Sequence, residues 1–183
     1  MARRKVRSGR IMEWTTETAN IAVPTTTPSV TLTTIDLDLL PDEIAEILMV
    51  EENLHVEQTA EIDGIIEVMS ALSMDPGTAM TDFITGGATQ AAQLEDLEVF
   101  WTHHFAEVAV AAGTPASYGV FKENDIKQTT FPEPILVGTN IGWNLCCVET
   151  ADISGDLEAV ITIYFKRRRA TAQELNQVLL KRR

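Results

Sequence analysis

The chain lacks long hydrophobic runs and is poor in cysteine. Its longest apolar stretches, residues 47–50 and 108–112, have the length of strands, whereas a helix needs about 20 apolar residues to cross a bilayer. The basic first ten residues lead into Ile11 and Trp14 rather than an apolar core, so we expect no secretory signal peptide. Cys146 and Cys147 are adjacent, and neighbours in a strand point to opposite faces. A bond between them would be strained, so we expect two free, structural, partly buried thiols.

Familiar catalytic motifs are also missing. The sequence has no G-x-S-x-G, G-x-x-x-x-G-K-[ST] or H-E-x-x-H motif. Gly86 and Gly87 form too short a glycine run to cradle phosphates. Cys146 has no obvious base near it in the sequence, although spacing alone does not decide whether a nucleophilic triad forms. We therefore predict that the protein is not an enzyme, needs no cofactor or metal, and has no small-molecule substrate.

Two groups of residues have the chemistry of metal ligands. His103 and His104 are adjacent, so in a strand they diverge, and at most one of them could join a given site. We expect one packed and one solvated histidine. Three aspartates that alternate near a predicted turn would suit Ca²⁺: Asp36, Asp38 and Asp42. They lack the D-x-D-x-D-G spacing, so we assign no metal site.

Cations are almost absent from the body of the sequence. Between residues 11 and 165 only Lys122 and Lys127 occur, against 26 acids, which gives a formal charge of −24. The other 12 of the 14 cations, with a single acid, lie in the two ends, which together carry +11. They are Arg3, Arg4, Lys5, Arg7, Arg10, Lys166, Arg167, Arg168, Arg169, Lys181, Arg182 and Arg183. This segregation predicts a solvent-facing body and basic ends that face a polyanion or an anionic membrane.

The acidic body has two interpretations. A surface this negative repels itself at low salt, whereas at molar salt the Debye length falls to about 3 Å and the repulsion is largely screened. The charge, with only five lysines among the 14 cations, therefore fits a protein that works at high salt. Simple solubility is the alternative, and charge alone does not decide between them.

The last 27 residues show the strongest local pattern. Apolar residues alternate from Leu157 to Phe165, which predicts a strand with one buried face. The strand runs directly into the cations at 166–169. Thr171 and Glu174 then form a T-x-x-E capping box, which predicts a helix over residues 171–181. A core strand thus brings two cationic clusters to one place on the surface.

Alternating apolar residues predict further strands at 30–39, 43–57, 61–72, 94–112, 118–121, 135–137 and 141–149. Because the apolar parity changes, we expect a bulge near Thr33 and Thr34 and a kink within 43–57. Ser154 and Gly155 predict a tight connection that makes 141–149 and 157–165 a hairpin. Residues 11–29, rich in threonine with two prolines, are expected to be extended and irregular.

Seven to nine strands with one C-terminal helix predict an all-β fold, an antiparallel β-sandwich. No β-then-α rhythm is present, which argues against a parallel sheet. About eight strands in about 150 residues suit a single jelly roll. The expected organisation is a basic N-terminal arm and lead-in at 1–29, a jelly-roll body at 30–169, and a short C-terminal helix with a basic tail at 170–183.

In this layout the chain resembles the single jelly-roll capsid proteins of icosahedral viruses. The likeness lies in the basic arm, the all-β body and the last strand, which ends in YFKRRR at 164–169. Its size and acidic body are most similar to the small major capsid protein of sphaerolipoviruses, membrane-containing viruses of halophilic archaea. The resemblance implies a homo-oligomeric virion component assembled in the host cytoplasm, capsomers shared with a larger capsid protein, and an internal membrane around double-stranded DNA. It implies no catalytic residues.

Three other classes of protein remain open from the sequence. A carbohydrate- or ligand-binding sandwich would expose Trp101, Trp143 and Tyr118 as a platform. A cupin-like enzyme would use His103 or His104 with a carboxylate and a further histidine around a metal. A nucleic-acid-binding protein would act alone through its tails. A mass measurement in near-native salt separates them, because a capsid protein should assemble and the others should stay small.

Overall fold

The computed structural model describes residues 12–21, 29–58, 65–77, 98–108, 121–149 and 157–180. Within these ranges the chain forms eight strands and one helix. The strands are β1 (Glu13–Ile21), β2 (Ser29–Asp36), β3 (Glu43–Gln58), β4 (Ile65–Ser73), β5 (Val99–Val108), β6 (Phe121–Val137), β7 (Asn140–Glu149) and β8 (Leu157–Arg169), and the helix is α2 (Ala172–Leu180).

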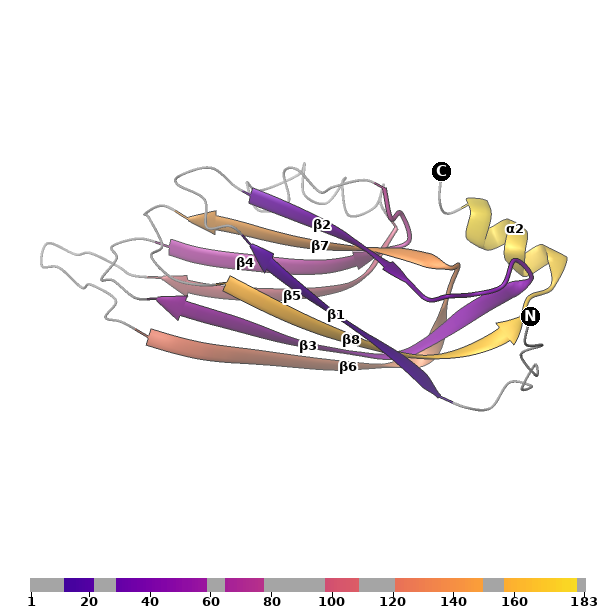
Figure 1. The fold of residues 1–183 in the computed structure, drawn as a ribbon, viewed down its shortest axis with the longest axis horizontal. Coiled ribbons are helices and arrows are strands. Elements are labelled where there is room, and N and C mark those ends of the chain that lie inside the picture. Colours follow the sequence, from indigo (N-terminus) through magenta and orange to yellow (C-terminus); the bar gives the residue numbers. More distant parts are fainter. Residues whose placement is uncertain are drawn as a thin grey trace, which may run out of the picture.

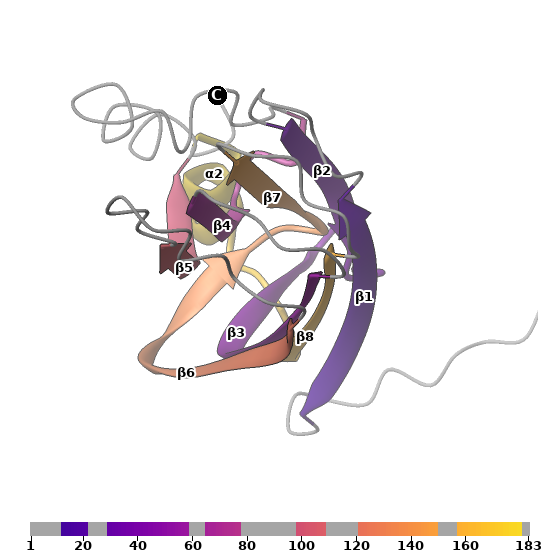
Figure 2. The ribbon, with the colours of Figure 1, turned by 90° about the vertical axis from the view of Figure 1, so that its left-hand side faces the viewer.

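The strands pair as one long antiparallel ribbon folded back on itself. β1 pairs with β8, β2 with β7, β3 with β6 and β4 with β5. Two further pairings, β3 with β8 and β4 with β7, join these ribbons into sheets of order β1-β8-β3-β6 and β2-β7-β4-β5. Figures 1 and 2 show one sheet above the other, with β1 and β2 at one side and β5 and β6 at the other. This is the strand order of a single jelly roll, so the predicted fold class is confirmed.

Side chains of the two inner faces fill the space between the sheets. Along β8, Ile161, Ile163 and Phe165 are at most 2% exposed, whereas the intervening Thr162 and Tyr164 are half-buried. Burial alternates because successive side chains of a strand point to opposite faces. Each large apolar side chain that is fully buried contributes about 1.5–3 kcal/mol, so this alternation is the main reason that the chain folds into two packed layers.

Irregularities occur at one of the two places predicted. In β3 the register shifts between Ile47 and Met49, which confirms the kink. The register of β2 with β7 is continuous, so the bulge near Thr33 and Thr34 is wrong. Leu32 is half-buried on the outer face of this edge strand, and that apolar residue on the wrong side produced the change of parity in the sequence.

β1 corrects the prediction for the N-terminal lead-in. Residues 13–21 are not irregular but form an edge strand along β8, where the hydroxyl groups of Thr16 and Thr162 lie 3.1 Å apart. Threonine is β-branched and suits a strand, whereas the two prolines of the segment fall after Ile21. The composition of residues 11–29 as a whole predicted irregular structure and hid the regular strand in the first half of the segment.

β6 and β7 correct two further predictions. Residues 135–137 end the 17-residue strand β6 rather than begin a strand. Opposite Leu48, the register of β6 jumps from Thr130 to Ile135, so Pro132 and Pro134 lie in a bulge of an edge strand, where no ladder hydrogen bond is lost. β7 and β8 belong to different sheets, so the predicted hairpin between them is wrong.

A turn at residues 75–77 packs closely against β7. The backbone N–H of Gly77 donates to Asp75 Oδ1 at 2.9 Å. A Cβ atom on Gly142 would lie 2.5 Å from the Asp75 carbonyl oxygen, so glycine is the residue that lets this turn approach the strand.

Candidate interaction surface at the helix end of the sandwich

The helix end of the sandwich consists of the end of β8, the starts of β1 and β3, and α2 (Figure 1). Glu13 at the start of β1 lies opposite Phe165, and Glu43 at the start of β3 lies opposite Arg169. The Ala170 N–H donates to the Asp42 carbonyl at 2.9 Å, which holds the chain as it leaves β8 for α2. The predicted cationic cluster at 166–169 therefore lies where three segments far apart in the sequence meet.

Arg168 joins β8 to both β3 and α2. Its Nη1 and Nη2 donate to Glu174 Oε2 and Oε1 at 3.0 and 2.6 Å, and its Nε donates to Glu46. Such a two-pronged pair matches the planar guanidinium to a carboxylate. The hydrogen bonds to Glu174 and Glu46 raise the pKa of Arg168 above its ordinary value. The bond from Arg168 lowers the pKa of Glu174 from 4.5 to about 2, with help from Thr171.

Glu174 also starts the helix, as the capping box predicted. Its Oε2 accepts hydrogen bonds from the Thr171 backbone N–H at 2.8 Å and from the Thr171 hydroxyl at 2.9 Å. In return the Glu174 N–H donates to Thr171 Oγ1 at 3.3 Å. The observed helix, Ala172–Leu180, lies within the predicted range. One carboxylate thus caps the helix and ties it to the sandwich.

Arg167 faces the start of β1 and the segment after β2. Its Nη1 donates to the Asp38 carbonyl at 2.6 Å and lies 3.7 Å from Asp38 Oδ2. Its Nε lies 2.8 Å from Glu13 Oε2, close enough for an ion pair but not aligned as a hydrogen bond. The guanidinium also lies 5.8 Å from the centre of the Phe165 ring. Arg167 therefore helps to hold β1 and the β2–β3 connection against β8.

Arg169 is held much more loosely. Its Nε lies 3.4 Å from Asp42 Oδ2, and the two side chains are 74% and 58% exposed. Around the three arginines lie five carboxylates: Glu13, Asp38, Asp42, Glu46 and Glu174. Acids from β1, β3, the β2–β3 connection and α2 therefore more than match the charge of the arginines at 167–169, a fact that spacing along the sequence does not reveal.

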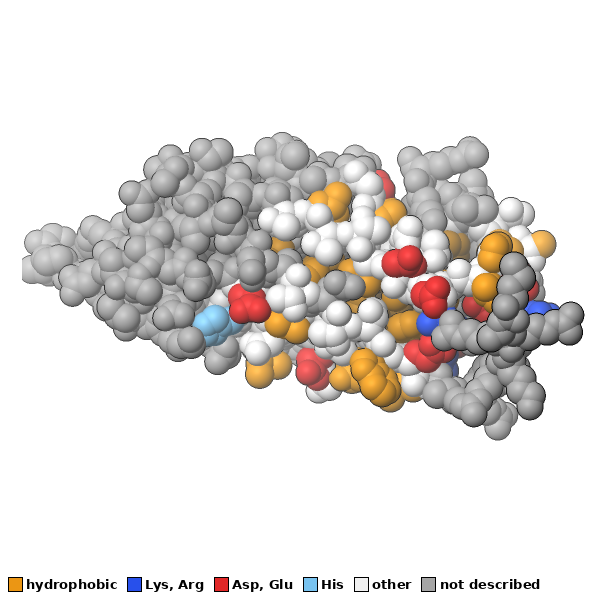
Figure 3. All heavy atoms as spheres, viewed as in Figure 1, with side chains coloured by type: hydrophobic (Ala, Val, Ile, Leu, Met, Phe, Trp, Pro, Cys, Tyr) orange, Lys and Arg blue, Asp and Glu red, His pale blue; other side chains and the backbone are white. Residues whose placement is uncertain are grey.

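The remaining predicted basic residues, Arg3, Arg4, Lys5, Arg7, Arg10, Lys181, Arg182 and Arg183, lie outside the described residues. Their attachment points are described. The chain enters the described body at Met12, next to Glu13, and leaves it at Leu180 in α2. Both basic ends are therefore attached at the helix end. In Figure 3, the blue atoms in the described part of this face also lie toward that end.

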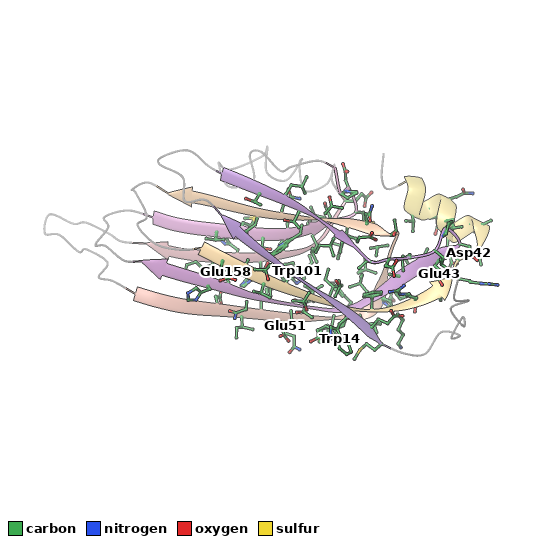
Figure 4. The ribbon with its side chains drawn as sticks, viewed as in Figure 1. Trp14, Asp42, Glu43, Glu51, Trp101 and Glu158 are labelled. Carbon is green, nitrogen blue, oxygen red and sulfur yellow. The ribbon has the colours of Figure 1, made fainter. Side chains whose placement is uncertain are left out.

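The outer face of the β1-β8-β3-β6 sheet carries exposed apolar side chains. Trp14 is 67% exposed and Ile126 64%, and Met12, which directly precedes β1, is 48% exposed. Trp14 lies opposite the half-buried Tyr164, which in turn lies opposite Met49. Figure 4 shows Trp14 and Glu51 pointing away from the sandwich on this side. Large apolar groups at an exposed sheet face are typical of surfaces that contact a partner.

A polar cluster inside the sandwich was not predicted. Glu52 on β3 is completely buried and lies 2.8 Å through Oε2 from His103 Nδ1 on β5. Its Oε1 accepts the Ser70 hydroxyl and lies 3.2 Å from Trp143 Nε1, which also donates to Ser70 at 2.8 Å. The other ring nitrogen of His103 lies 3.0 Å from Asp125 Oδ2 on β6. We call these five residues the inter-sheet cluster.

The histidine prediction is confirmed, and the cluster had one signal in the sequence. His103 is 4% exposed and His104 is exposed, as expected for one packed and one solvated residue. Glu52 stands between the inward-facing Val50 and Leu54, where an acid needs a partner inside the core. The sequence does not show that this partner is His103, because the two residues belong to different sheets.

Residues named for two of the alternative functions are not placed as those functions require. Trp101 and Trp143 are 4% and 0% exposed, so they form no exposed sugar-binding platform, and Tyr118 lies outside the described residues. Both nitrogens of His103 face carboxylates of the chain. Within the described ranges, no group of three or more acidic, histidine or cysteine side chains is arranged to hold a metal ion.

The aspartates considered for Ca²⁺ serve the chain itself. Asp36 Oδ1 accepts the Asp38 N–H at 2.8 Å, while Asp42 lies beside Arg169 and Asp38 beside Arg167. Asp38 adopts a φ of 51°, which the bond to Asp36 supports. Cys146 and Cys147 lie on β7, but the positions of their thiols are outside the description.

A groove of about 530 Å³ runs along the seam between β5 and β6, the edge strands of the two sheets. Phe100, Trp101 and Phe131 line it. Side-chain hydrogen bonds cross the seam from Trp101 Nε1 to Thr129 Oγ1 at 3.0 Å and from Lys127 Nζ to the Thr102 carbonyl at 2.7 Å, beside the contact between His103 and Asp125. The opposite side of the sandwich, between β1 and β2, has closer contacts between the sheets.

In the described part of the chain, α2 has nine residues, and no helix has the length and apolar character needed to span a bilayer.

The strand order defines the chain as a single jelly-roll protein. A chain from the structure titled Desmodium yellow mottle tymovirus is 7% identical, with a TM-score of 0.37, over 94% of this chain and 96% of that one. A chain from the Merkel cell polyomavirus VP1 unassembled pentamer is 9% identical, with a TM-score of 0.44, over 92% of this chain and 98% of that one. No family model and no curated protein sequence matches the chain. The jelly-roll assignment rests on the strand order.

Proposed function

We propose that the chain is a structural capsid protein that assembles, as a homo-oligomer and with a second capsid protein, into the icosahedral shell of a virus. The observation that carries this proposal is the single jelly roll whose acidic body has both basic ends attached at one end. Jelly rolls also occur in lectins and cupins. The buried tryptophans and the carboxylate-bound His103 favour a structural role over those two functions.

The attachment points support a polar orientation of the subunit in its shell. Arg3, Arg4, Lys5, Arg7 and Arg10 precede Met12, and Lys181, Arg182 and Arg183 follow α2, so both groups emerge at the helix end. An anionic surface contributes about 1 kcal/mol for each nearby Lys or Arg at ordinary ionic strength. The proposal therefore directs the helix end toward an internal membrane or the viral DNA, and the acidic body toward the other subunits and solvent.

The contacts at the helix end divide the basic residues by role. Arg167 and Arg168 are engaged by carboxylates of the same chain and chiefly hold the sandwich and α2 together. Arg169 is 74% exposed, and Lys166 is half-buried. These two residues, with the eight cations of the termini, are the better candidates for direct contact with lipid phosphates or nucleic acid.

The exposed apolar side chains on the outer face of the β1 sheet supply a candidate assembly surface. Trp14 and Met12 lie at the point where the chain enters the edge strand β1. Edge strands and exposed aromatic residues are usually covered by a neighbour in an assembly. The proposal therefore includes a subunit contact over Trp14, and it places the shell in a virion of a halophilic archaeal virus, assembled in the host cytoplasm, as the acidic charge suggests.

Sedimentation and electron microscopy of the purified protein in molar salt test the assembly. We expect capsomers or closed particles, formed by the chain alone or after co-expression with its partner capsid protein. Trp14→Ser should reduce assembly, whereas Thr18→Ser, an exposed change further along β1, should not. A chain that remains monomeric in low and high salt, alone and with the partner, would falsify the capsid proposal.

Binding to two polyanions tests the basic ends. Deletion of residues 1–10 leaves β1 intact, unlike a deletion of 1–29, and should weaken association with anionic vesicles or with double-stranded DNA. The ligand whose binding falls identifies the natural partner. Neutral vesicles are the control. Binding of both polyanions that is unaffected by the deletion would show that the arm has another role.

A further inference from the structure

The inter-sheet cluster joins the two sheets through a buried histidine. Glu52 and Asp125 come from β3 and β6 of one sheet, whereas His103 comes from β5 of the other. The Glu52 and His103 side chains are 0% and 5% exposed, and that of Asp125 is 39% exposed. His103 thus stands between a carboxylate in the core and a carboxylate at the rim.

The geometry determines which protonation state satisfies both contacts. A carboxylate only accepts hydrogen bonds, and a neutral imidazole has one N–H and one lone pair. Both ring nitrogens of His103 face carboxylate oxygens, at 2.8 and 3.0 Å. Both contacts are hydrogen bonds only when the ring carries two N–H groups and a positive charge. In the neutral ring, one lone pair faces a carboxylate oxygen.

The other groups around the ring do not change this requirement. Ser70 on β4 and Trp143 on β7 direct their hydrogens at Glu52, which keeps that carboxylate an acceptor. Trp101 meets the ring edge with an intercentroid distance of 6.1 Å. Lys127 on β6 is directed to the Thr102 carbonyl and the face of Trp101. The two carboxylates are therefore the described charges in direct contact with His103.

We propose that His103 is a proton-dependent latch that holds β5 against β3 and β6. With the ring protonated, Glu52 and Asp125 bind it from both sides and the seam is closed. Loss of the proton removes one of these hydrogen bonds and sets a lone pair against a carboxylate. β5 and β6 are edge strands of different sheets, joined in the described chain by side-chain contacts, so the seam loosens first.

Loosening has a defined consequence for the surface. The groove lined by Phe100, Trp101 and Phe131 lies beside the latch, so separation of β5 from β6 widens it and exposes apolar side chains. The stabilisation from both contacts is present while the His103 ring carries two N–H groups and is lost when the ring gives up one proton. The seam is therefore expected to be tight in mildly acidic solution and looser in alkaline solution.

Nitrogen-15 NMR of the wild-type protein tests the protonation state directly. We expect both ring nitrogens of His103 to carry protons at pH 6, with the signals moving to the neutral form as the pH is raised. The chain has three histidines, so assignment by substitution of His55 and His104 is straightforward. A folded protein in which His103 is neutral at pH 6 overturns the proposal.

Hydrogen exchange, corrected for intrinsic rates, tests the opening. Between pH 6 and 9, protection of residues 99–105 and 125–131 should fall roughly fivefold or more relative to β1 and β8. Asp125→Asn removes the rim carboxylate and should abolish most of this difference, whereas His104→Gln, on the outer face of the same strand, should keep it. Constant seam protection while His103 titrates, or a full response in Asp125→Asn, overturns the latch.

Discussion

Two clusters of charged side chains hold the sandwich together in opposite environments. In the inter-sheet cluster, Glu52 and His103 are removed from water and every contact is made by the protein. At the helix end the ion pair of Arg168 with Glu174, which we call the clamp, is only partly buried, because the two side chains are 32% and 24% exposed. Burial of an ion pair carries a desolvation cost that only a complete set of hydrogen bonds offsets, whereas water replaces a lost partner at the surface. Loss of a charged partner should therefore reduce stability more in the inter-sheet cluster than at the helix end.

Glu52→Gln should reduce the stability of the sandwich more than any substitution at the helix end. It leaves the shape but removes the charge that pairs with His103, and breaking a buried pair costs about 3 kcal/mol. For a chain of this size that corresponds to a fall in Tm of roughly 6–12 °C. Glu51→Gln, the neighbour on the outer face, is the matched control and should remain within about 0.5 kcal/mol of the wild type. Equal unfolding free energies for the two variants in urea titrations would show that the buried cluster has no special weight.

Added salt should change the effect of the surface charges on stability but not that of the buried cluster. The −24 body repels itself in dilute buffer, so Tm should rise by several degrees on going to molar salt. The loss caused by Glu52→Gln should stay nearly constant, because counterions do not reach the core. Differential scanning calorimetry at two salt concentrations measures both. A flat or falling Tm for the wild type would remove the high-salt interpretation but not the capsid proposal.

Glu174→Gln should detach the helix without unfolding the sandwich. The amide keeps part of the capping but loses the two-pronged pair with Arg168. Hydrogen exchange should become faster in residues 172–180 and remain unchanged in β3 and β8. Gln173→Ala, at an exposed position of the same helix, is the control. Global destabilisation as large as that of Glu52→Gln would contradict the comparison.

Acid should release the clamp in a defined range. The hydrogen bonds from Arg168 and Thr171 lower the pKa of Glu174 from 4.5 to about 2 in the folded protein. This contribution to stability is complete above pH 4.5 and is lost as the pH falls toward 2. Exchange in α2 should accelerate over that interval in the wild type, and Glu174→Gln should lack this step. A helix whose protection is the same at pH 5 and pH 2 would show that the pair does not hold it.

Arg169→Ser should have the smallest effect on stability. Its contact with Asp42 is long and both side chains are exposed, so the unfolding free energy should stay within about 0.5 kcal/mol of the wild type. Binding to anionic vesicles should nevertheless decrease, since this cation faces solvent at the helix end. Arg168→Ser is the comparison, because it should impair α2. A large stability loss in Arg169→Ser would mean that exposure is a poor guide to role at this end.

The sequence by itself determined the local structure of the chain. Alternation of apolar residues defined β5, β7 and β8, and the Thr171–Glu174 box defined the start of α2. These signals are local because side chains two residues apart in a strand share a face and because a capping box closes within four residues. Where composition replaced periodicity, as in residues 13–21, or where prolines interrupted it, as in β6, the prediction was wrong.

Tertiary structure alone decided which residues face one another. The sequence contained Glu52 and His103, but 51 residues separate them, and only the packing of one sheet on the other makes them partners. It contained the arginines at 166–169, but not the carboxylates of β1 and β3 that engage them. Strand order is likewise non-local, which is why the sequence predicted a hairpin of β7 and β8 although the two strands lie in different sheets. Charge and periodicity are properties of a sequence, whereas the partner of a buried or strand-end charge is a property of the fold.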